Sequence, residues 1–188
     1  VMPALHQLSP AKLILVIHGG QSTDTERDKT KEHLDKLAGL YGKILEIKTE
    51  KADAYDPVAT AAKIAAIIEA ERKNGCRVIV NITGGRKILG LGVLFGAYAR
   101  IDQVERIVYG ADFDPRLIDL PKMSFNMGNT KIRMLEARRK NPKQSVSEAA
   151  EKVGVTPAMA YVHLRELKAM GYVNDDYEVT SAGRLALL

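Results

Sequence analysis

The sequence predicts an α/β fold followed by a small and mostly helical domain. Up to about residue 121, short apolar runs alternate with segments of helical periodicity. The clearest runs are solid Val, Ile and Leu, as in parallel strands that are covered on both faces. Beyond that point the pattern changes to three short helices and a hairpin. We therefore predict a Rossmann-like, mostly parallel, doubly wound sheet over residues 1–126 and a small winged helix-turn-helix domain over residues 127–188.

The elements of the first domain are predicted from apolar runs and helix signals. The first ten residues show no period and predict a loose start. Strands are expected at 12–17, 43–49, 76–82, 104–110 and, more briefly, 116–121. Helices are expected between them, at 24–41, 57–74 and 88–100. The second of these helices has the strongest start signal, because Asp56 is a good N-cap and Pro57 suits the first helical position.

The second domain is predicted from two helix caps and a turn. Ser145, with Glu148 three residues later, forms a capping box that starts a helix. Thr156 and Pro157 start the next helix in the same way as Asp56 and Pro57. A helix at 131–142 precedes both, and two short strands joined by a turn at 174–176 follow them.

Composition excludes several classes of protein. The chain has 188 residues, a formal net charge of +5 and a single cysteine, so an internal disulfide and a cysteine-based metal site are not expected. The mildly basic charge permits a nucleic-acid or phosphate partner without demanding one. We find no signal peptide and no run apolar enough to span a bilayer, which predicts a cytoplasmic protein with no membrane partner. The histidines show no metal spacing, so no metal is expected and no cofactor is obligatory.

Two loops with paired glycines predict a site for a phosphate-bearing ligand. Gly19-Gly20 and Gly84-Gly85 each follow a buried strand, where ligands of open parallel sheets bind. Glycine lets the backbone approach a ligand, and the next helix offers free N–H groups to an anion. The second loop reads Thr-Gly-Gly-Arg-Lys and so adds a hydroxyl and two positive charges. The candidate ligand-binding residues are Gly19, Gly20, Gln21, Ser22, Thr83, Gly84, Gly85, Arg86 and Lys87.

A purely structural interpretation of these loops remains open, because tight strand-to-helix turns also need glycine. Known phosphate motifs do not match: the chain has no Walker loop. The stretch GLGVLFG, residues 90–96, mimics a dinucleotide fingerprint but falls inside the expected helix. Its glycines are expected to allow close helix packing rather than NAD binding.

The stretch NITGGRKILGLG after a buried strand resembles the signature loop of the CARF domain, the Rossmann-like sensor of CRISPR-associated proteins. The winged helix-turn-helix downstream extends the resemblance to archaeal CRISPR-associated transcriptional regulators over nearly the whole chain. The resemblance implies a homodimer that binds a cyclic oligoadenylate, often the tetra-adenylate, across its two-fold axis. It also implies that the two glycine loops named above contact this effector.

The second domain has an unusual recognition helix for a DNA-binding domain. Pro157, Ala158, Met159 and Val162 are apolar where base contacts are expected, and the turn at 174–176 is acidic where phosphate contacts prefer Lys or Arg. A basic excess remains in this domain. The candidate residues for binding double-stranded DNA are Arg138, Arg139, Lys140, Lys143, Thr156, Tyr161 and Arg165. The alternative is that this domain dimerises or contacts another protein.

The sequence as a whole therefore predicts a transcriptional regulator that senses a cyclic oligoadenylate and binds DNA. One alternative is a ring nuclease that cleaves the cyclic ligand, with a winged domain that only dimerises. Another is a nucleotide-sensing scaffold that binds a protein. No catalytic residues are assigned, because no Ser-His-Asp order or paired-carboxylate pattern is present. At most we expect a slow ring nuclease.

Overall fold

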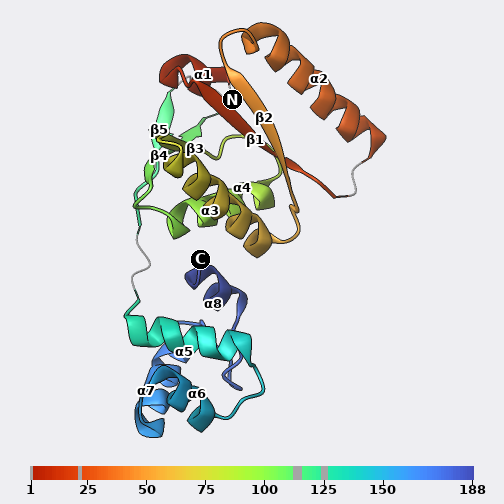
Figure 1. Ribbon diagram of the computed structural model, residues 1–188. Helices are drawn as coiled ribbons and strands as arrows, with labels where there is room; N and C mark the ends of the chain where they lie inside the picture. Colours follow the sequence, from red (N-terminus) through yellow and green to blue (C-terminus); the bar gives the residue numbers. More distant parts are fainter. Residues whose placement is uncertain (1, 21–22, 112–115, 124–126) are drawn as a thin grey trace. The chain divides into compact units, whose positions relative to one another are not determined.

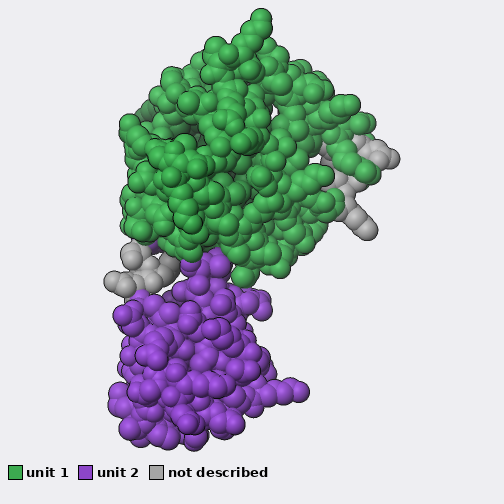
Figure 2. All heavy atoms as spheres, viewed as in Figure 1, with its two compact units in different colours: residues 1–122 green, residues 123–188 purple. Residues whose placement is uncertain are grey.

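The computed structural model describes residues 2–20, 23–111, 116–123 and 127–188. The chain divides into two compact units, Val1–Lys122 and Met123–Leu188 (Figure 2). None of the described helices is both long enough and apolar enough to cross a membrane.

The first unit is an α/β structure with mostly parallel strands, as predicted (Figure 1). β1 (Lys12–His18) pairs in parallel with β2 (Glu46–Ala52). β3 (Val78–Asn81) pairs in parallel with β4 (Val104–Gly110), and the short β5 (Leu117–Asp119) pairs with β4 in antiparallel fashion. Among the described residues these strands form two sheets, β1-β2 and β3-β4-β5, rather than one continuous doubly wound sheet.

Side-chain packing joins the two sheets. Val16 of β1 packs against the core cluster that contains Val80 of β3 and Ile107 of β4. The same valine also contacts a smaller cluster at the end of β2, which includes Ala52 and Ala54. β1 is half-buried along its whole length rather than fully buried, and among the described residues its backbone pairs with β2 alone.

The helices of the first unit differ in how they are covered. α3 (Pro57–Lys73) and α4 (Lys87–Ala99) run alongside each other (Figure 1). α3 begins as predicted, because the side chain of Asp56 accepts hydrogen bonds from the backbone N–H groups of Val58 and Ala59. α2 (Asp24–Tyr41) is mostly exposed: Leu34 and Leu37 are partly buried, and Leu40 is 68% exposed.

Two glycines of the GLGVLFG stretch, Gly92 and Gly96, serve packing. A Cβ on Gly92 would lie 2.6 Å from Cγ2 of Thr60, and one on Gly96 would lie 2.5 Å from Cβ of Ile64. Both contacts are shorter than a side chain tolerates, so glycine is what lets α4 approach α3.

One helix of the first unit was not predicted. The first residues form α1 (Met2–Leu8) rather than a loose start. Ala4 and Leu5 are buried, so tertiary packing stabilises a segment that has no clear period of its own.

The second unit contains α5 (Asn129–Lys140), α6 (Val146–Val153), α7 (Pro157–Ala169) and α8 (Ser181–Ala186). The capping box of Ser145 and Glu148 is present, and the Thr156 side chain accepts from the N–H of Met159. The predicted hairpin is reduced to a single antiparallel bridge between Val173 and Val179.

The segment between Val173 and Val179 is held by backbone and side-chain hydrogen bonds, among them the bond from the N–H of Asn174 to the carbonyl of Glu178 at 2.9 Å. Oδ1 of Asn174 accepts from the backbone N–H groups of Asp176 and Glu178, at 3.0 and 2.8 Å. Tyr177 has a φ of 59°, a left-handed value that a regular strand does not allow. These local contacts explain why two regular strands do not form.

Candidate functional site

Three strand-to-helix loops come together in the first unit at the carboxyl ends of β1, β2 and β3. The N–H of Gly19 donates to the carbonyl of Ala52 at 2.9 Å, which ties the end of β1 to the end of β2. Nη1 of Arg86, in the loop after β3, donates to the hydroxyl of Tyr55, in the loop after β2, at 2.6 Å. The two predicted glycine loops are therefore linked through a third loop that the sequence did not single out.

Gly84 and Gly85 have φ values of 82° and 75°, in the left-handed region. A Cβ on either residue would meet no atom within 4 Å, so the need for glycine comes from the backbone conformation. Both residues are exposed. The turn therefore presents open backbone, which leaves room for a ligand.

The N-terminus of α4 suits an anion. Arg86 occupies the N-cap position, and no side chain of the described residues caps the helix there. The first N–H groups of a helix that lacks such a cap favour negative charge. Lys87, the first residue of α4, is exposed and forms no ion pair with another described residue.

Thr83 has a structural role in the described chain. Its hydroxyl donates to Oδ1 of Asn81 at 2.5 Å and accepts from the N–H of Gly110 at 2.6 Å. These bonds connect the ends of β3 and β4 and occupy the hydroxyl hydrogen. A hydrogen bond donated by the Thr83 hydroxyl to a ligand would therefore have to replace the bond to Asn81.

The first glycine loop lies against His18, the last residue of β1. A Cβ on Gly20 would lie 2.7 Å from Cε1 and 2.8 Å from Nε2 of the imidazole. Nδ1 of His18 accepts from the N–H of Ala54 at 3.1 Å, so a neutral ring carries its hydrogen on Nε2. Nε2 is buried and has no hydrogen-bond partner in the described part of the chain. Gln21 and Ser22, the other candidates of this loop, lie outside the described residues.

The sequence patterns did not identify Tyr55 and His18 as residues of the site. The strand prediction ended β2 at residue 49, three residues before its observed end at Ala52, so Tyr55 was not assigned to a strand-to-helix loop. The signal that could have found it is Asp53, whose carboxylate accepts from the N–H of Tyr55 and so marks a turn. Among the described residues, no group of three or more His, Cys, Asp and Glu could hold a metal ion.

The second unit exposes most of the residues proposed for DNA. Arg139, Lys140 and Lys143 are exposed at the end of α5 and in the loop after it. Arg165 and Tyr161 are exposed on α7, and Tyr161 packs edge-on against Tyr177 with 6.4 Å between ring centroids. Thr156 is exposed as well, and its hydroxyl caps α7.

Arg138 is the exception, because its side chain is buried and only 4% of the residue is exposed. Its guanidinium donates to the carbonyls of Gln144, Tyr177 and Asp176 at 2.6, 2.9 and 3.3 Å. The segment between Val173 and Val179 is the wing of this domain. The bonds of Arg138 attach the turn of the wing, and the loop before α6, to α5. Arg138 is therefore a structural residue, and the prediction of a phosphate contact at this position is corrected.

The acidic turn of the wing is partly neutralised. Nζ of Lys168, on α7, lies 2.7 Å from Oδ1 of Asp175. This bond lowers the pKa of Asp175 and raises that of Lys168. The repulsion of a phosphate by the wing is therefore weaker than the sequence suggested.

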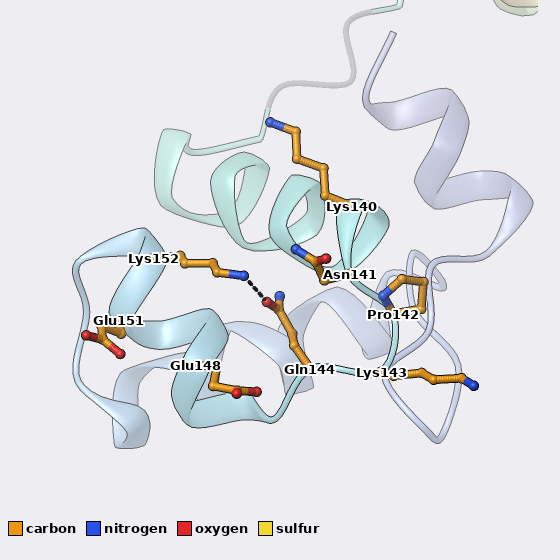
Figure 3. A pocket seen from close by; sticks show the side chains of 8 residues that line it. All are labelled: Lys140, Asn141, Pro142, Lys143, Gln144, Glu148, Glu151 and Lys152. Atoms are coloured by element: carbon orange, nitrogen blue, oxygen red, sulfur yellow. Dashed lines mark hydrogen bonds between the residues drawn. The ribbon is translucent and has the colours of Figure 1, made fainter.

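A depression of roughly 940 Å³ in the second unit lies between the end of α5 and α6 (Figure 3). Its lining mixes Lys140, Lys143 and Lys152 with Glu148 and Glu151. Nζ of Lys152 donates to Oε1 of Gln144, and the Glu148 carboxylate accepts from Ser145 in the capping box. Lys152 and Glu148 therefore serve the local structure of this unit.

The fold defines an α/β unit followed by a winged helix-turn-helix unit. Residues 127–174 match the family described as winged helix-turn-helix DNA-binding, so the predicted order of the two folds is confirmed.

One solved structure with a similar fold is that of Can2 from Sulfobacillus thermosulfidooxidans in complex with cyclic tetra-adenylate. The match has a TM-score of 0.48 and 14% sequence identity, and it covers 98% of this chain and 58% of Can2. The chain thus spans less than two thirds of the length of that protein. No curated protein sequence matches this chain.

Proposed function

We propose that this protein is a CRISPR-associated transcriptional regulator that binds a cyclic oligoadenylate in its α/β unit, as a homodimer, and DNA through its winged helix. One observation carries this proposal. Gly84 and Gly85 open the backbone at an uncapped helix start where Arg86 and Lys87 supply positive charge, in a chain that also carries a winged helix-turn-helix. A phosphate-bearing effector and a DNA-binding output fit this combination.

The charge of the winged unit supports the second part of the proposal, DNA binding, which is the output of the regulator. Arg139, Lys140, Lys143 and Arg165 are exposed, and in the described part of the chain none of them forms an ion pair. Such residues suit phosphate contacts, which displace counterions and make binding weaken steeply as salt rises. The exposed side chains of Met159, Tyr161 and Val162 offer few hydrogen bonds to base edges, so discrimination between sequences is expected to be modest.

The ligand half is tested by thermal shift and calorimetry. Cyclic tri-, tetra- and hexa-adenylate and linear tetra-adenylate are each titrated into the protein. A ligand that binds only the folded state raises the apparent Tm, and the proposal expects this for at least one ring and more weakly for the linear form. Chromatography of the same mixtures detects cleavage. Many turnovers within minutes would favour a ring nuclease over a regulator.

The output half is tested by a salt series of anisotropy titrations on duplex DNA. Binding at low salt that weakens as salt rises agrees with contacts dominated by phosphate. No binding at low salt would show that the winged helix of this protein does not contact DNA. Sedimentation of the free protein determines whether it is the proposed dimer.

A further inference from the structure

Tyr55 occupies a central place in the site of the three loops. Its hydroxyl accepts from Nη1 of Arg86 at 2.6 Å, and the Arg86 guanidinium carbon lies 5.6 Å from the centroid of the Tyr55 ring. The His18 ring meets the Tyr55 ring edge-on, with 5.5 Å between centroids. Tyr55 therefore contacts His18, the last residue of β1, and Arg86, in the loop after β3.

The residue Tyr55 is nevertheless 71% exposed. Its backbone is held independently of the ring, because the N–H donates to the Asp53 carboxylate at 2.9 Å just before Asp56 caps α3. The Tyr55 ring adds little to the core, and the backbone conformation of Tyr55 in the turn does not depend on the ring. An exposed and pre-positioned aromatic ring next to an anion-binding helix start is suited to stacking with a nucleobase.

His18 adds a second observation that points to a ligand. The hydrogen on Nε2 of a neutral ring is a buried donor that no described residue accepts, and Nε2 lies against the Gly20 backbone. A ligand with acceptor atoms at the first glycine loop would provide the missing partner. Aromatic ring, positive charge and buried donor together match the base and phosphate of a nucleotide rather than a simple phosphate.

We infer that Tyr55 is a specificity-determining residue of this site: its ring stacks on a base of the ligand, and its hydroxyl holds Arg86 in place for a phosphate. This inference rests on the proposed function, and it adds the recognition of a base by a loop that lies outside the glycine motifs. It makes the ligand a nucleotide, so that the base contributes to affinity in addition to the charge.

The test compares Tyr55→Ala and Tyr55→Phe with the wild type in calorimetric titrations. The probes are cyclic tetra-adenylate, linear tetra-adenylate, ATP and inorganic tripolyphosphate, which lacks a base. Stacking of one base is worth about 1–3 kcal/mol, so Tyr55→Ala is expected to weaken nucleotide binding by about 5- to 150-fold. Tyr55→Phe keeps the ring and is expected to lose less. Because the ring is exposed, melting of the ligand-free variants should match the wild type.

Leu40→Ala is the control, since it removes another exposed side chain of the same unit, outside the three loops, and should leave nucleotide binding unchanged. If a nucleotide binds the wild type and Tyr55→Ala equally well, the inference is wrong and the proposed function stands. If linear tetra-adenylate or ATP binds in a Tyr55-dependent way and the cyclic probe does not bind, the inference stands and the proposed effector is wrong. Binding of tripolyphosphate as tight as that of the nucleotides, or of no nucleotide at all, overturns the inference.

Discussion

Arg86 and Lys87 carry the positive charge of the proposed nucleotide site, and Arg139 and Lys140 carry part of that of the proposed DNA interface. The double variant Arg86→Ala/Lys87→Ala should weaken cyclic tetra-adenylate binding by at least about tenfold, because each charge-assisted hydrogen bond contributes about 1.5–3 kcal/mol. The variant Arg139→Ala/Lys140→Ala makes the same change of charge in the other unit. It should weaken DNA binding and lower the salt slope by about 1 per lost phosphate contact.

Each double variant is the control for the other in calorimetry and anisotropy. The assignment predicts that the first variant keeps direct DNA binding in the absence of ligand and that the second keeps nucleotide binding. Loss of both activities in either variant would point to a defect in folding. Undiminished nucleotide affinity in Arg86→Ala/Lys87→Ala would contradict the assignment of the anion site to these two residues.

Arg138 tests the structural role of a buried cation. Arg138→Ala leaves the carbonyls of Tyr177 and Gln144 without their donor, and an unsatisfied buried acceptor costs about 1–3 kcal/mol. The variant should therefore destabilise the winged unit by about 3 kcal/mol in denaturant unfolding. Arg139→Ala, next to it in the sequence but exposed, should change stability little. Equal effects of the two substitutions would contradict the structural role of Arg138.

The packing of α3 on α4 is the element-scale feature that depends most on glycine. Gly96→Ala places a methyl group 2.5 Å from Cβ of Ile64, and overpacking of this kind costs about 1–3 kcal/mol. Gly39→Ala, on exposed α2, meets no atom within 4 Å and should instead stabilise by about 0.4–1 kcal/mol. Chemical denaturation of both variants measures the difference. Equal stability would show that the two helices can move apart freely.

An ion pair fastens β1 to α3 and gives the fold a dependence on pH. Nζ of Lys12 donates to Oε1 of Glu71 at 2.6 Å, which lowers the pKa of Glu71 and raises that of Lys12. A lowered carboxyl pKa gives stability that is present above the ordinary value near 4.5 and is lost as the pH falls below it. A raised lysine pKa gives stability that is lost only as the pH rises above about 10.5.

The variant Lys12→Met should therefore be less stable than the wild type near pH 7 and lose less stability on acidification from pH 6 to pH 3. Thermal melts across this range provide the measurement. Lys36→Met breaks an exposed pair with Glu32 on α2 and is the control, for which a smaller change is expected. An identical acid response in wild type and Lys12→Met would show that the pair does not couple β1 to α3.

The elements that the sequence predicted are those with a local signal. Three helix starts are encoded within a few residues of sequence: Asp56 before Pro57, Ser145 with Glu148, and Thr156 before Pro157. Each of these caps is present in the structure. What could not be predicted depends on contacts between distant residues. Arg138 looks like part of a basic run, and its burial follows from carbonyls 38 and 39 positions away.

The candidate site divides in the same way. The turn of Gly84 and Gly85 follows from local glycine chemistry, and their left-handed φ values agree with it. The bond from Arg86 to Tyr55 joins residues 31 positions apart and becomes visible only when β2 and β3 are placed. The distribution of strands over two sheets is another property of packing, which alternating apolar runs do not encode.

At the scale of the whole molecule, a sensor needs a coupling free energy between its two sites. If a nucleotide in the α/β unit changes the DNA affinity of the winged unit, DNA changes the nucleotide affinity by the same factor. Coupling in such systems is typically about 5- to 150-fold. The proposed function therefore predicts a measurable link between two binding events, in addition to the events themselves.

The measurement that tests this most directly is the affinity for a fluorescent duplex at fixed salt, with and without saturating cyclic tetra-adenylate. The proposed function predicts a change of at least about fivefold in the wild type. It predicts no change in Arg86→Ala/Lys87→Ala, whose ligand-free DNA affinity should match that of the wild type. A wild-type protein that binds the cyclic nucleotide and holds DNA with the same affinity in its presence would contradict the claim that this chain is a nucleotide-responsive regulator.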